Sequence, residues 1–372
     1  MRGVTGNPYD TKYGNIVSGK DSLIVNVFMK LSELKEILKS YLNAYFDKRY
    51  QTIGFSWIDN IGEVRDTVLC NQLDKNLIDD ILSKSFTHLY AAPPDIIDWE
   101  HIRGFCFSGM GKNKDKEDSY DMDFDIVDYI NYIHKIKYKP NILEKIKRDR
   151  LYAITSAGEV YSICSVYSSI VFQTTVYNET YILYAGNWYI INNNFFQTVV
   201  DYVDKIPISS IPLPDCKEKV EKDYNLSVEK SDSKYCLMDR KLVFVVGAPK
   251  QIEACDIFTD DKQFIHIKFK SKSAQISHLF SQGKVSAQCF LSDEMFRKQI
   301  LDMATKKFGK AVFNYRDKPK PYEYEVVFVI IDKKVDKISK RLPFFSLVNL
   351  MLTAQELERM NMKYSIKIVK KV

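Results

Sequence analysis

Residues 252–283 read IEACDIFTDDKQFIHIKFKSKSAQISHLFSQG, which joins two strand-like stretches to the start of a helix. In FIHIKFK, apolar residues alternate with His266, Lys268 and Lys270, so a strand sends the polar and apolar sets to opposite faces. The turn residues TDDKQ allow IEACDIF to pair with this strand as an antiparallel hairpin. We therefore expect Asp256 to approach the face that carries His266 and Lys268.

A hairpin that gathers these side chains contains the parts needed for phosphodiester hydrolysis. A carboxylate such as Asp256 can hold a divalent cation, and oxygen ligands suit Mg²⁺ or Mn²⁺. A nearby lysine can orient or deprotonate a water, or offset charge in the transition state. A surface hairpin without chemistry can carry the same residues, so the flanking sequence has to decide.

Helical patterns flank the hairpin on both sides. The stretch CKEKVEKDYNLSVEK predicts a preceding helix that carries Glu221, with Glu218 as the competing acid. The following helix begins near Ser277 and places His278 and Gln282 on one face, because they are four residues apart. Glu253 precedes Asp256 by three residues and faces away from it in a regular strand, unless a bulge intervenes.

The rest of the chain predicts an α/β (α+β) protein. The stretch 157–205 alternates β-branched and aromatic residues between turns, which is typical of a β-meander. Helices are predicted at 31–50, 73–86 and 142–154, and a strand at 22–29.

A domain boundary is predicted at 206–216, a segment with three prolines and no helical period. Residues 1–206 would form an N-terminal α+β lobe that contains the meander and serves substrate selection or oligomer contacts. Residues 207–372 would form a mixed sheet flanked by helices, with the hairpin at its centre.

Composition places the protein among ordinary globular chains. No apolar run approaches the roughly 18–20 residues of a membrane span, and the N-terminus MRGVTGNPYD is too polar for a signal peptide. The seven cysteines are widely spaced and form no CxxC pair, which argues against a structural zinc site or a disulfide framework. We expect reduced thiols, a cytoplasmic location and no membrane partner.

Positive charge is concentrated near the hairpin. From Lys262 to Arg341 there are 18 Lys/Arg and 8 Asp/Glu, although the formal charge of the whole chain is only +6. Such a region suits a polyanion-binding surface, although lysine-rich faces are also often merely solvated. The candidate nucleic-acid contacts are Lys270, Lys272, His278 and Lys284.

Other chemistries have little support in the sequence. It contains no G-x-S-x-G, no Walker A motif and no G-x-G-x-x-G loop, which argues against a serine hydrolase of that type and against ATP or dinucleotide binding. The acids of YDMDFD (120–125) precede an apolar helix, so a capped helix start is the better interpretation than a metal site.

The helix–hairpin–helix pattern resembles the PD-(D/E)XK nuclease superfamily. The resemblance implies that Asp256 is a metal ligand, Glu221 a second acid, Lys268 the water-orienting base and Gln282 a helper. His266 departs from the pattern, because it stands where an acid or glutamine is usual. The resemblance leaves His266 as a metal ligand or water-positioning group, and histidine suits zinc better than magnesium.

A wider set of stretches resembles the bacterial "sporadically distributed protein" family of uncharacterised function. These are E-x-x-Y-N (221–225), CLMDRKL, IEACDIF, IHIKFK, SHLFSQG and LPFFSLVNL (342–350). Its members are patchily distributed, often among mobile or defence genes, and are typically longer at the N-terminus. The resemblance implies a role in defence, and a chain that is a short member or lacks a leading domain.

These observations predict a metal-dependent DNA endonuclease that acts against foreign phage or plasmid DNA. Mg²⁺ or Mn²⁺ is the expected cofactor, and RNA is the lesser alternative as substrate. Further copies of the chain, or a protein of the same defence operon, are the expected protein partners. The alternative is a catalytically inactive nucleic-acid-binding or assembly module that lost metal affinity through His266.

Overall fold

The computed structural model describes residues 4–19, 22–53, 55–86, 88–94, 102–108, 110, 120, 124–136, 141–239, 241–245, 252–270 and 273–372. The chain divides into two units, Met1–Asn60 and Ile61–Val372. Both contain helices and strands, which confirms the predicted α+β class. In the described part of the chain, no helix is both long and apolar enough to cross a membrane.

The first unit is a small antiparallel sheet followed by a helix. Its strands β1 (Val4–Gly6), β2 (Ile16–Gly19) and β3 (Leu23–Asn26) pair in the order β1-β2-β3. Helix α1 (Leu34–Phe46) follows. The predicted strand and helix in this region are therefore present, and both are shorter than the sequence pattern indicates.

In its described residues, the first part of the second unit contains two antiparallel sheets and four helices. One sheet has the order β4-β11-β10-β9-β5, and the other has the order β6-β7-β8. The predicted meander at 157–205 is therefore confirmed for β9, β10 and β11 only, because its first strand, β8, pairs with β7 in the other sheet. The strands are β4 (Ile61–Glu63), β5 (Leu89–Ala91), β6 (Ile102–Phe107), β7 (Arg150–Thr155), β8 (Val160–Ser165), β9 (Ile170–Val176), β10 (Glu179–Tyr184) and β11 (Asn187–Ile191). The helices are α2 (Thr67–Ser83), α3 (Ile126–Lys135), α4 (Ile142–Arg148) and the short α5 (Val166–Ser169). Asp125 caps α3 by accepting from the backbone N–H of Val127, as a capped helix start at 120–125 requires.

The predicted helix at 142–154 is wrong in its second half. Helix α4 ends at Arg148, and the next residues form β7, which pairs with β6 on one side and β8 on the other. The change occurs at buried Asp149, whose carboxylate accepts from Lys145 Nζ at 2.6 Å and from the Tyr129 hydroxyl at 2.8 Å. Pairing with two distant strands overrides the local helical pattern.

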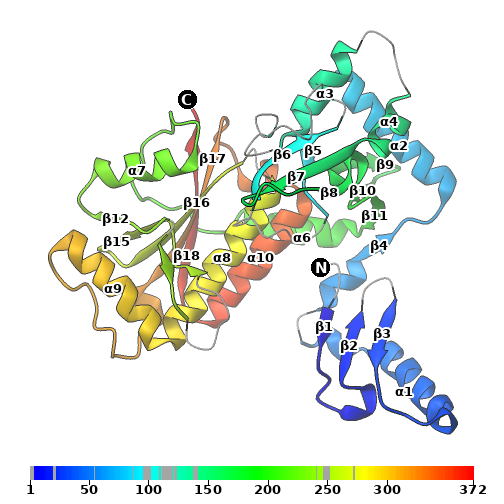
Figure 1. The fold of residues 1–372 in the computed structure, drawn as a ribbon, viewed down its shortest axis with the longest axis horizontal. Coiled ribbons are helices and arrows are strands. Elements are labelled where there is room, and N and C mark those ends of the chain that lie inside the picture. The colour runs from blue at the N-terminus through cyan, green and yellow to red at the C-terminus, as the bar shows by residue number, and fades with distance from the viewer. Residues whose placement is uncertain are drawn as a thin grey trace. The chain divides into compact units, whose positions relative to one another are not determined.

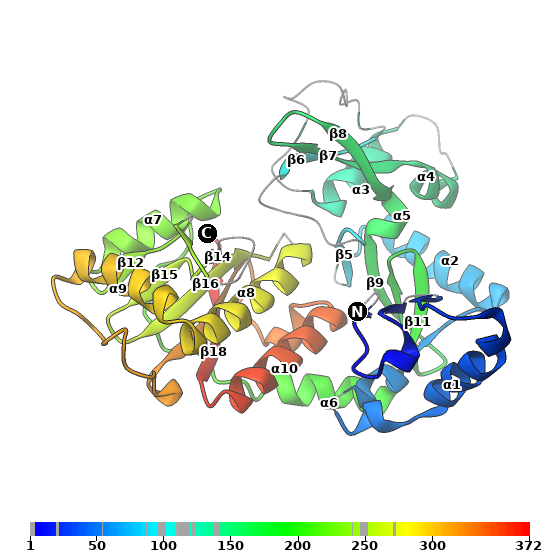
Figure 2. The same ribbon diagram turned by 60° about the horizontal axis from the view of Figure 1, so that its bottom comes forward.

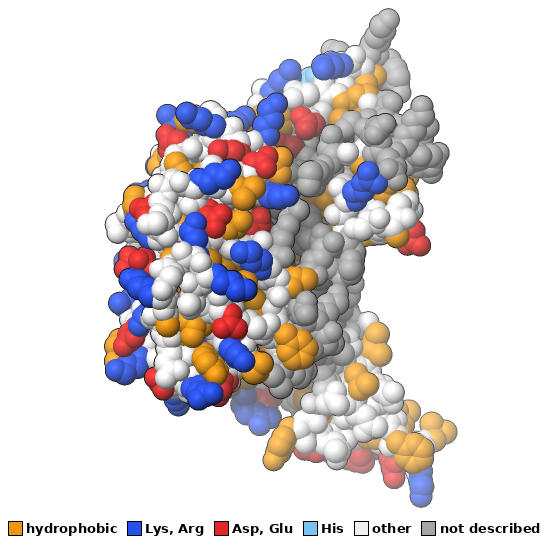
Figure 3. All heavy atoms as spheres, turned by 60° about the vertical axis from the view of Figure 1, so that its left-hand side comes forward, with side chains coloured by type: hydrophobic (Ala, Val, Ile, Leu, Met, Phe, Trp, Pro, Cys, Tyr) orange, Lys and Arg blue, Asp and Glu red, His pale blue; other side chains and the backbone are white. Residues whose placement is uncertain are grey.

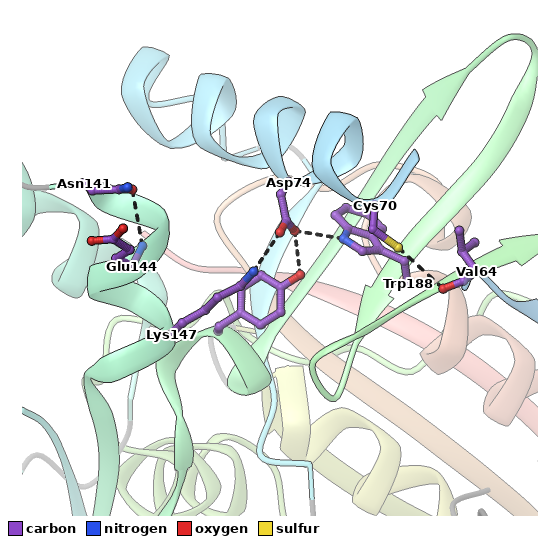
Figure 4. A network of polar contacts seen from close by, with 8 residues as sticks. Val64, Cys70, Asp74, Asn141, Glu144, Lys147 and Trp188 are labelled. Atoms are coloured by element: carbon purple, nitrogen blue, oxygen red, sulfur yellow. Dashed lines mark hydrogen bonds and ion pairs between the residues drawn. The ribbon is translucent and has the colours of Figure 1, made fainter. Parts of the chain in front are cut away.

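A buried carboxylate ties this part of the unit together. Asp74 of α2 accepts from the Tyr167 hydroxyl at 2.6 Å, from Trp188 Nε1 at 2.9 Å and from Lys147 Nζ at 2.9 Å (Figure 4). The three donors come from α5, β11 and α4. Because each donor finds an acceptor, the polar groups are buried without loss of hydrogen bonding.

The second part is a five-stranded mixed sheet between helices (Figures 1 and 2). Its order is β12-β15-β16-β17-β18, with β12 (Tyr235–Leu237), β15 (Ile257–Thr259), β16 (Gln263–Phe269), β17 (Glu325–Asp332) and β18 (Lys363–Lys370). The first three strands are antiparallel neighbours, and β16, β17 and β18 are parallel. A separate pair, β13 (Leu242–Val243) with β14 (Ile252–Glu253), lies between β12 and β15 in the chain.

Helices cover both faces of this sheet, and the crossover connections that its parallel strands need supply the helices of one face. Helices α8 (Ser273–Ser292) and α9 (Glu294–Phe308) connect β16 to β17, and α10 (Phe344–Arg359) connects β17 to β18. Residues of these three helices share a core with Phe264 and Phe328 of the sheet. The opposite face carries Ile265 and Ile267 and packs on α7 (Glu221–Ser231).

The chain passes between the two parts through α6 (Asn193–Val203) and the proline-rich segment after it. This segment runs along the free edge of β18, where Ser209 N donates to Ile366 O at 2.9 Å and Cys216 N donates to Lys370 O at 2.8 Å. Proline is tolerated there because an edge position needs fewer N–H donors. The predicted boundary near residue 206 lies at this passage, inside the second unit, and stays a prediction.

Replacement of Asp74 tests the buried junction. Asp74→Ala removes the acceptor of the buried Tyr167 hydroxyl and Trp188 N–H, so we expect a loss of about 2–4 kcal/mol in the free energy of unfolding. Urea denaturation followed by tryptophan fluorescence measures it. Asp79→Ala, at an exposed position of the same helix, is the matched control and should change stability by less than about 0.5 kcal/mol. Equal stability of the two variants would contradict the role given to Asp74.

A second prediction concerns the packing of α8 on the sheet. A Cβ at buried Gly283 would lie 2.5 Å from Cε1 of Phe328. Gly283→Ala gains up to about 1 kcal/mol in helix propensity, but overpacking costs about 1–3 kcal/mol. We expect a net loss of about 1 kcal/mol in urea denaturation, whereas Gln288→Ala, at an exposed position of α8, should be nearly neutral. A more stable Gly283→Ala variant would show that α8 has room to move.

Candidate functional site

The hairpin of β15 and β16 forms, but its first strand is shorter than expected. Ile257 pairs with Ile265 and Phe258 with Phe264. Residues 252–253 belong to β14 and pair with β13 instead, so the backbone leaves strand geometry at 254–256. This break decides which side chains meet Asp256.

Asp256 is buried, and both its backbone and its side chain form hydrogen bonds with neighbouring elements. Its N–H donates to Ile265 O at 3.0 Å, and its carbonyl accepts from the N–H groups of Met238 and Asp239 at 2.8 and 3.0 Å. Its carboxylate accepts from Ile267 N at 2.7 Å through Oδ2 and from Asn225 Nδ2 at 3.2 Å through Oδ1. The side chain therefore replaces a missing strand partner beside β16.

Lys268 lies close to this carboxylate and forms an ion pair with Glu221 at the start of α7. Burial by itself would lower the pKa of Lys268, but the negative charges of Glu221 and Asp256 outweigh it and raise the pKa. Burial also raises the pKa of Asp256 well above its usual range; Lys268 opposes this shift, and Glu221 and Glu253 add to it. The structure thus brings together three of the predicted residues, Glu221, Asp256 and Lys268.

Two acids that the sequence analysis did not select also meet Asp256. Asp239, Glu253 and Asp256 each offer a carboxylate oxygen, and these oxygens all lie within 4.8 Å of one another. Asp239 follows β12 and is held by its N–H bond to Asp256. Glu253 is placed by the break at 254–256, where the Ser286 hydroxyl of α8 donates to Ala254 O.

Sequence signals for these acids were weak. Glu253 and Asp256 face apart in a regular strand, so only knowledge of the break predicts their approach. Asp239 stands in CLMDRKL directly after a strand, a position where polar side chains cluster at sheet ends. Asn225 lies one helical turn after Glu221, and this spacing would have placed it toward the same site.

His266 lies on β16 but is not one of the residues that bond to the acids Asp239, Glu253 and Asp256. Its side chain is buried, and its ring centroid lies 6.3 Å from that of Phe328. Burial, with smaller contributions from the charges of Lys268 and His278, lowers its pKa to about 3. The imidazole is therefore neutral at physiological pH.

Gln282 and His278 occupy the face of α8 that turns toward the hairpin. They precede Ser286 by one and two helical turns, and Ser286 bonds the backbone beside Glu253. Gln282 is half-buried, and His278 is exposed.

The other predicted nucleic-acid contacts differ in accessibility. Lys270 is mostly buried, 3.6 Å from Asp332 in an ion pair and over the ring of Tyr90. Lys284 is half-buried, and Lys272 lies outside the described residues. On the face shown in Figure 3, Lys and Arg side chains alternate with acidic and apolar ones, so positive charge is dispersed there.

Unpartnered polar atoms point to a ligand at this site. Four buried side-chain atoms lack a hydrogen-bond partner among the described residues: Tyr41 Oη, Glu221 Oε2, Asn225 Oδ1 and His266 Nε2. Two of them belong to residues bonded to Lys268 and Asp256, namely Glu221 and Asn225, whereas the ring nitrogen of His266 lies on the side of β16 that faces Phe328. Such atoms are rare and cost about 1–3 kcal/mol each. Together with the clustered carboxylates, this oxygen-rich set fits a divalent cation.

The neutral state of His266 makes a pH prediction. Because the unfolded chain binds a proton near pH 6.5 and the folded chain only near pH 3, the stability that depends on neutral His266 is complete above pH 6.5 and is lost as the pH falls. Relative to His266→Gln, the wild type should lose about 1.4 kcal/mol per pH unit between pH 6 and 4 in urea denaturation. His88→Gln, at an exposed position, should follow the wild type. Parallel curves for wild type and His266→Gln would contradict the assignment.

Comparison with known proteins gives a family without a known activity. No curated protein and no solved structure matches the chain. A family model described as a family of unknown function (DUF6119) matches residues 1–370. The chain therefore belongs to that family.

Proposed function

We propose that the protein is a metal-dependent endonuclease that cleaves foreign DNA in the cytoplasm, with its centre at Asp256 and Lys268. The observation that carries the proposal is the buried ionic cluster in which the hairpin and α7 bring Asp256, Lys268 and Glu221 together. Buried ionisable groups with shifted pKa values that lie together are typical of functional sites.

The order of elements supports the proposal. Helix α7 carries Glu221, the β15–β16 hairpin carries Asp256 and Lys268, and α8 then packs across the sheet. This is the helix–hairpin–helix arrangement on which the resemblance to PD-(D/E)XK nucleases rests. A defence role depends on the further resemblance to the sporadically distributed bacterial family and belongs to the proposal alone.

The residues present can hold a divalent cation. Asp256 would be one ligand, with the others drawn from Glu221 and His266 or from Asp239 and Glu253. When bound, Mg²⁺ or Mn²⁺ would polarise the scissile phosphate and lower the pKa of a nearby water.

The chain's own residues define the remaining chemistry. Because Glu221 and Asp256 keep Lys268 protonated, its ammonium would orient a water or offset phosphate charge, and would not accept a proton. Asn225 and the Ile267 N–H fix the direction of the Asp256 carboxylate. Gln282, on the α8 face above the hairpin, remains the proposed helper, and Lys270, Lys272, His278 and Lys284 the proposed DNA contacts.

A second function is favoured by His266. A neutral histidine stands where the nuclease pattern has an acid or glutamine, and Lys270 is already paired with Asp332. An inactive nucleic-acid-binding or assembly module, acting as a homo-oligomer or with a defence partner, would tolerate both features. RNA is the lesser alternative as the bound polymer.

Plasmid cleavage separates the two functions. Purified protein is incubated with supercoiled and linear DNA in Mg²⁺, Mn²⁺ or EDTA, beside Asp256→Asn and Lys268→Met. Loss of an electrostatic contact to the reacting phosphate costs about 10²–10³-fold in rate, so both variants should lose at least about a hundredfold. Asp261→Asn, on the exposed hairpin turn, should cleave like the wild type.

Two results would reject the nuclease or its centre. Intact DNA under every metal, with equal gel shifts for wild type and variants, would favour the binding module. Cleavage that survives both Asp256→Asn and Lys268→Met would place the active site elsewhere. Thermal melting of each variant shows whether a loss of activity reflects unfolding.

A further inference from the structure

The acids Asp239, Glu253 and Asp256 come from two segments, the turn after β12 and the stretch 253–256, and backbone hydrogen bonds hold both in place. Asp239 and Asp256 are joined by a main-chain hydrogen bond of 3.0 Å, and the α8 bond to Ala254 fixes the residue after Glu253. Their oxygens meet within 4.8 Å. Among the described residues, this is the one set of three acidic, histidine or cysteine side chains grouped so closely.

Asn225 gives independent evidence that this group receives a ligand. The residue is fully buried, and its Nδ2 donates to Asp256 Oδ1 at 3.2 Å. The amide oxygen of the same group is buried and has no hydrogen-bond partner among the described residues, while the nitrogen of the same amide is bonded to Asp256. If the amide were turned around, its oxygen would face the carboxylate oxygen and be repelled by it. The hydrogen bond to Asp256 therefore identifies the amide oxygen as the atom without a partner.

The donor set selects one chemical class of ligand. Three carboxylates that converge in a partly desolvated place repel one another, and Lys268, whose charge acts on Asp256, is in an ion pair with Glu221. Four oxygens, three of them anionic, match the ligands of hard divalent cations. A zinc site would instead favour nitrogen or sulfur ligands.

We infer that Asp239, Glu253, Asp256 and the amide oxygen of Asn225 bind one hard divalent cation, and that Glu221 and His266 are not its ligands. Glu221 holds Lys268 on the α7 side, and His266 lies against Phe328 in the core between the sheet and α8. The inference deepens the proposed function by naming the ligands of its metal, and it rests on the same site. It replaces the set Asp256, Glu221 and His266 that the nuclease pattern suggests.

Binding of Mn²⁺ alone, without DNA, tests the ligand set. Calorimetry and the electron paramagnetic resonance of free Mn²⁺ give affinity and stoichiometry for the full chain, and competition with Mg²⁺ and Ca²⁺ identifies a hard-cation site. We expect one Mn²⁺ per chain. Asp239→Asn and Glu253→Gln should weaken binding at least tenfold, and Asn225→Leu by about 10–100-fold, the usual scale for loss of a supporting ligand.

Asp261→Asn, on the exposed hairpin turn, is the matched control and should bind Mn²⁺ like the wild type. His266→Gln and Glu221→Gln test the competing ligand set and should bind Mn²⁺ within about threefold of wild type. Loss of binding in these two with retention in Asp239→Asn and Glu253→Gln would overturn the inference, as would absence of Mn²⁺ binding by the wild type at millimolar concentration. Asp239 and Glu253 are half-buried and their replacements keep the side-chain shape, so folding should survive; melting curves verify this.

The experiments can reject the proposed metal site and the proposed nuclease function independently of each other. Mn²⁺ binding that follows the predicted pattern, without DNA cleavage, keeps the cation site and removes the endonuclease. DNA cleavage by a protein whose Mn²⁺ binding depends on Glu221 and His266 would keep the endonuclease and reject the inferred ligand set.

Discussion

The buried carboxylate of Asp256 is the constraint on which the C-terminal sheet and its site depend. Its backbone bonds β16 and the residues after β12, and its side chain bonds β16 and α7. The backbone N–H of Ile267, beside which no strand continues the sheet, therefore still has a hydrogen-bond acceptor. The same arrangement buries a carboxyl group, which costs free energy unless hydrogen bonds and opposite charges compensate for the lost hydration.

A second buried carboxylate, Asp74, shows what a structural solution looks like. Its two oxygens receive a hydroxyl, an indole N–H and an ammonium, and these donors satisfy the carboxylate fully (Figure 4). Around Asp256, by contrast, three carboxylates are grouped, and the buried amide oxygen of Asn225 has no partner among the described residues. This difference is the physical reason for proposing a cation at Asp256 and none at Asp74.

Charge in the C-terminal part is organised mainly by local pairing. Lys268 forms an ion pair with Glu221, and Lys270 and Arg341 both form ion pairs with Asp332. Part of the excess positive charge in this stretch is therefore neutralised by acids within the fold. Nucleic-acid binding, as proposed, would depend on the exposed remainder, which Figure 3 shows dispersed among acids on the face over α7 and α9.

Elements with a period that is regular over many residues follow from the local pattern of side chains. Alternation in FIHIKFK predicted β16 and its two faces, and helical spacing predicted α8, because side-chain direction follows directly from local geometry. Where such patterns stop depends on contacts between distant parts of the chain. The strand β7 replaced half of a predicted helix through pairing with β6 and β8, and the break at 254–256 turned Glu253 toward Asp256. Both outcomes depend on partners distant in the chain, which no local period encodes, and the acids Asp239 and Glu253 became neighbours of Asp256 for that reason.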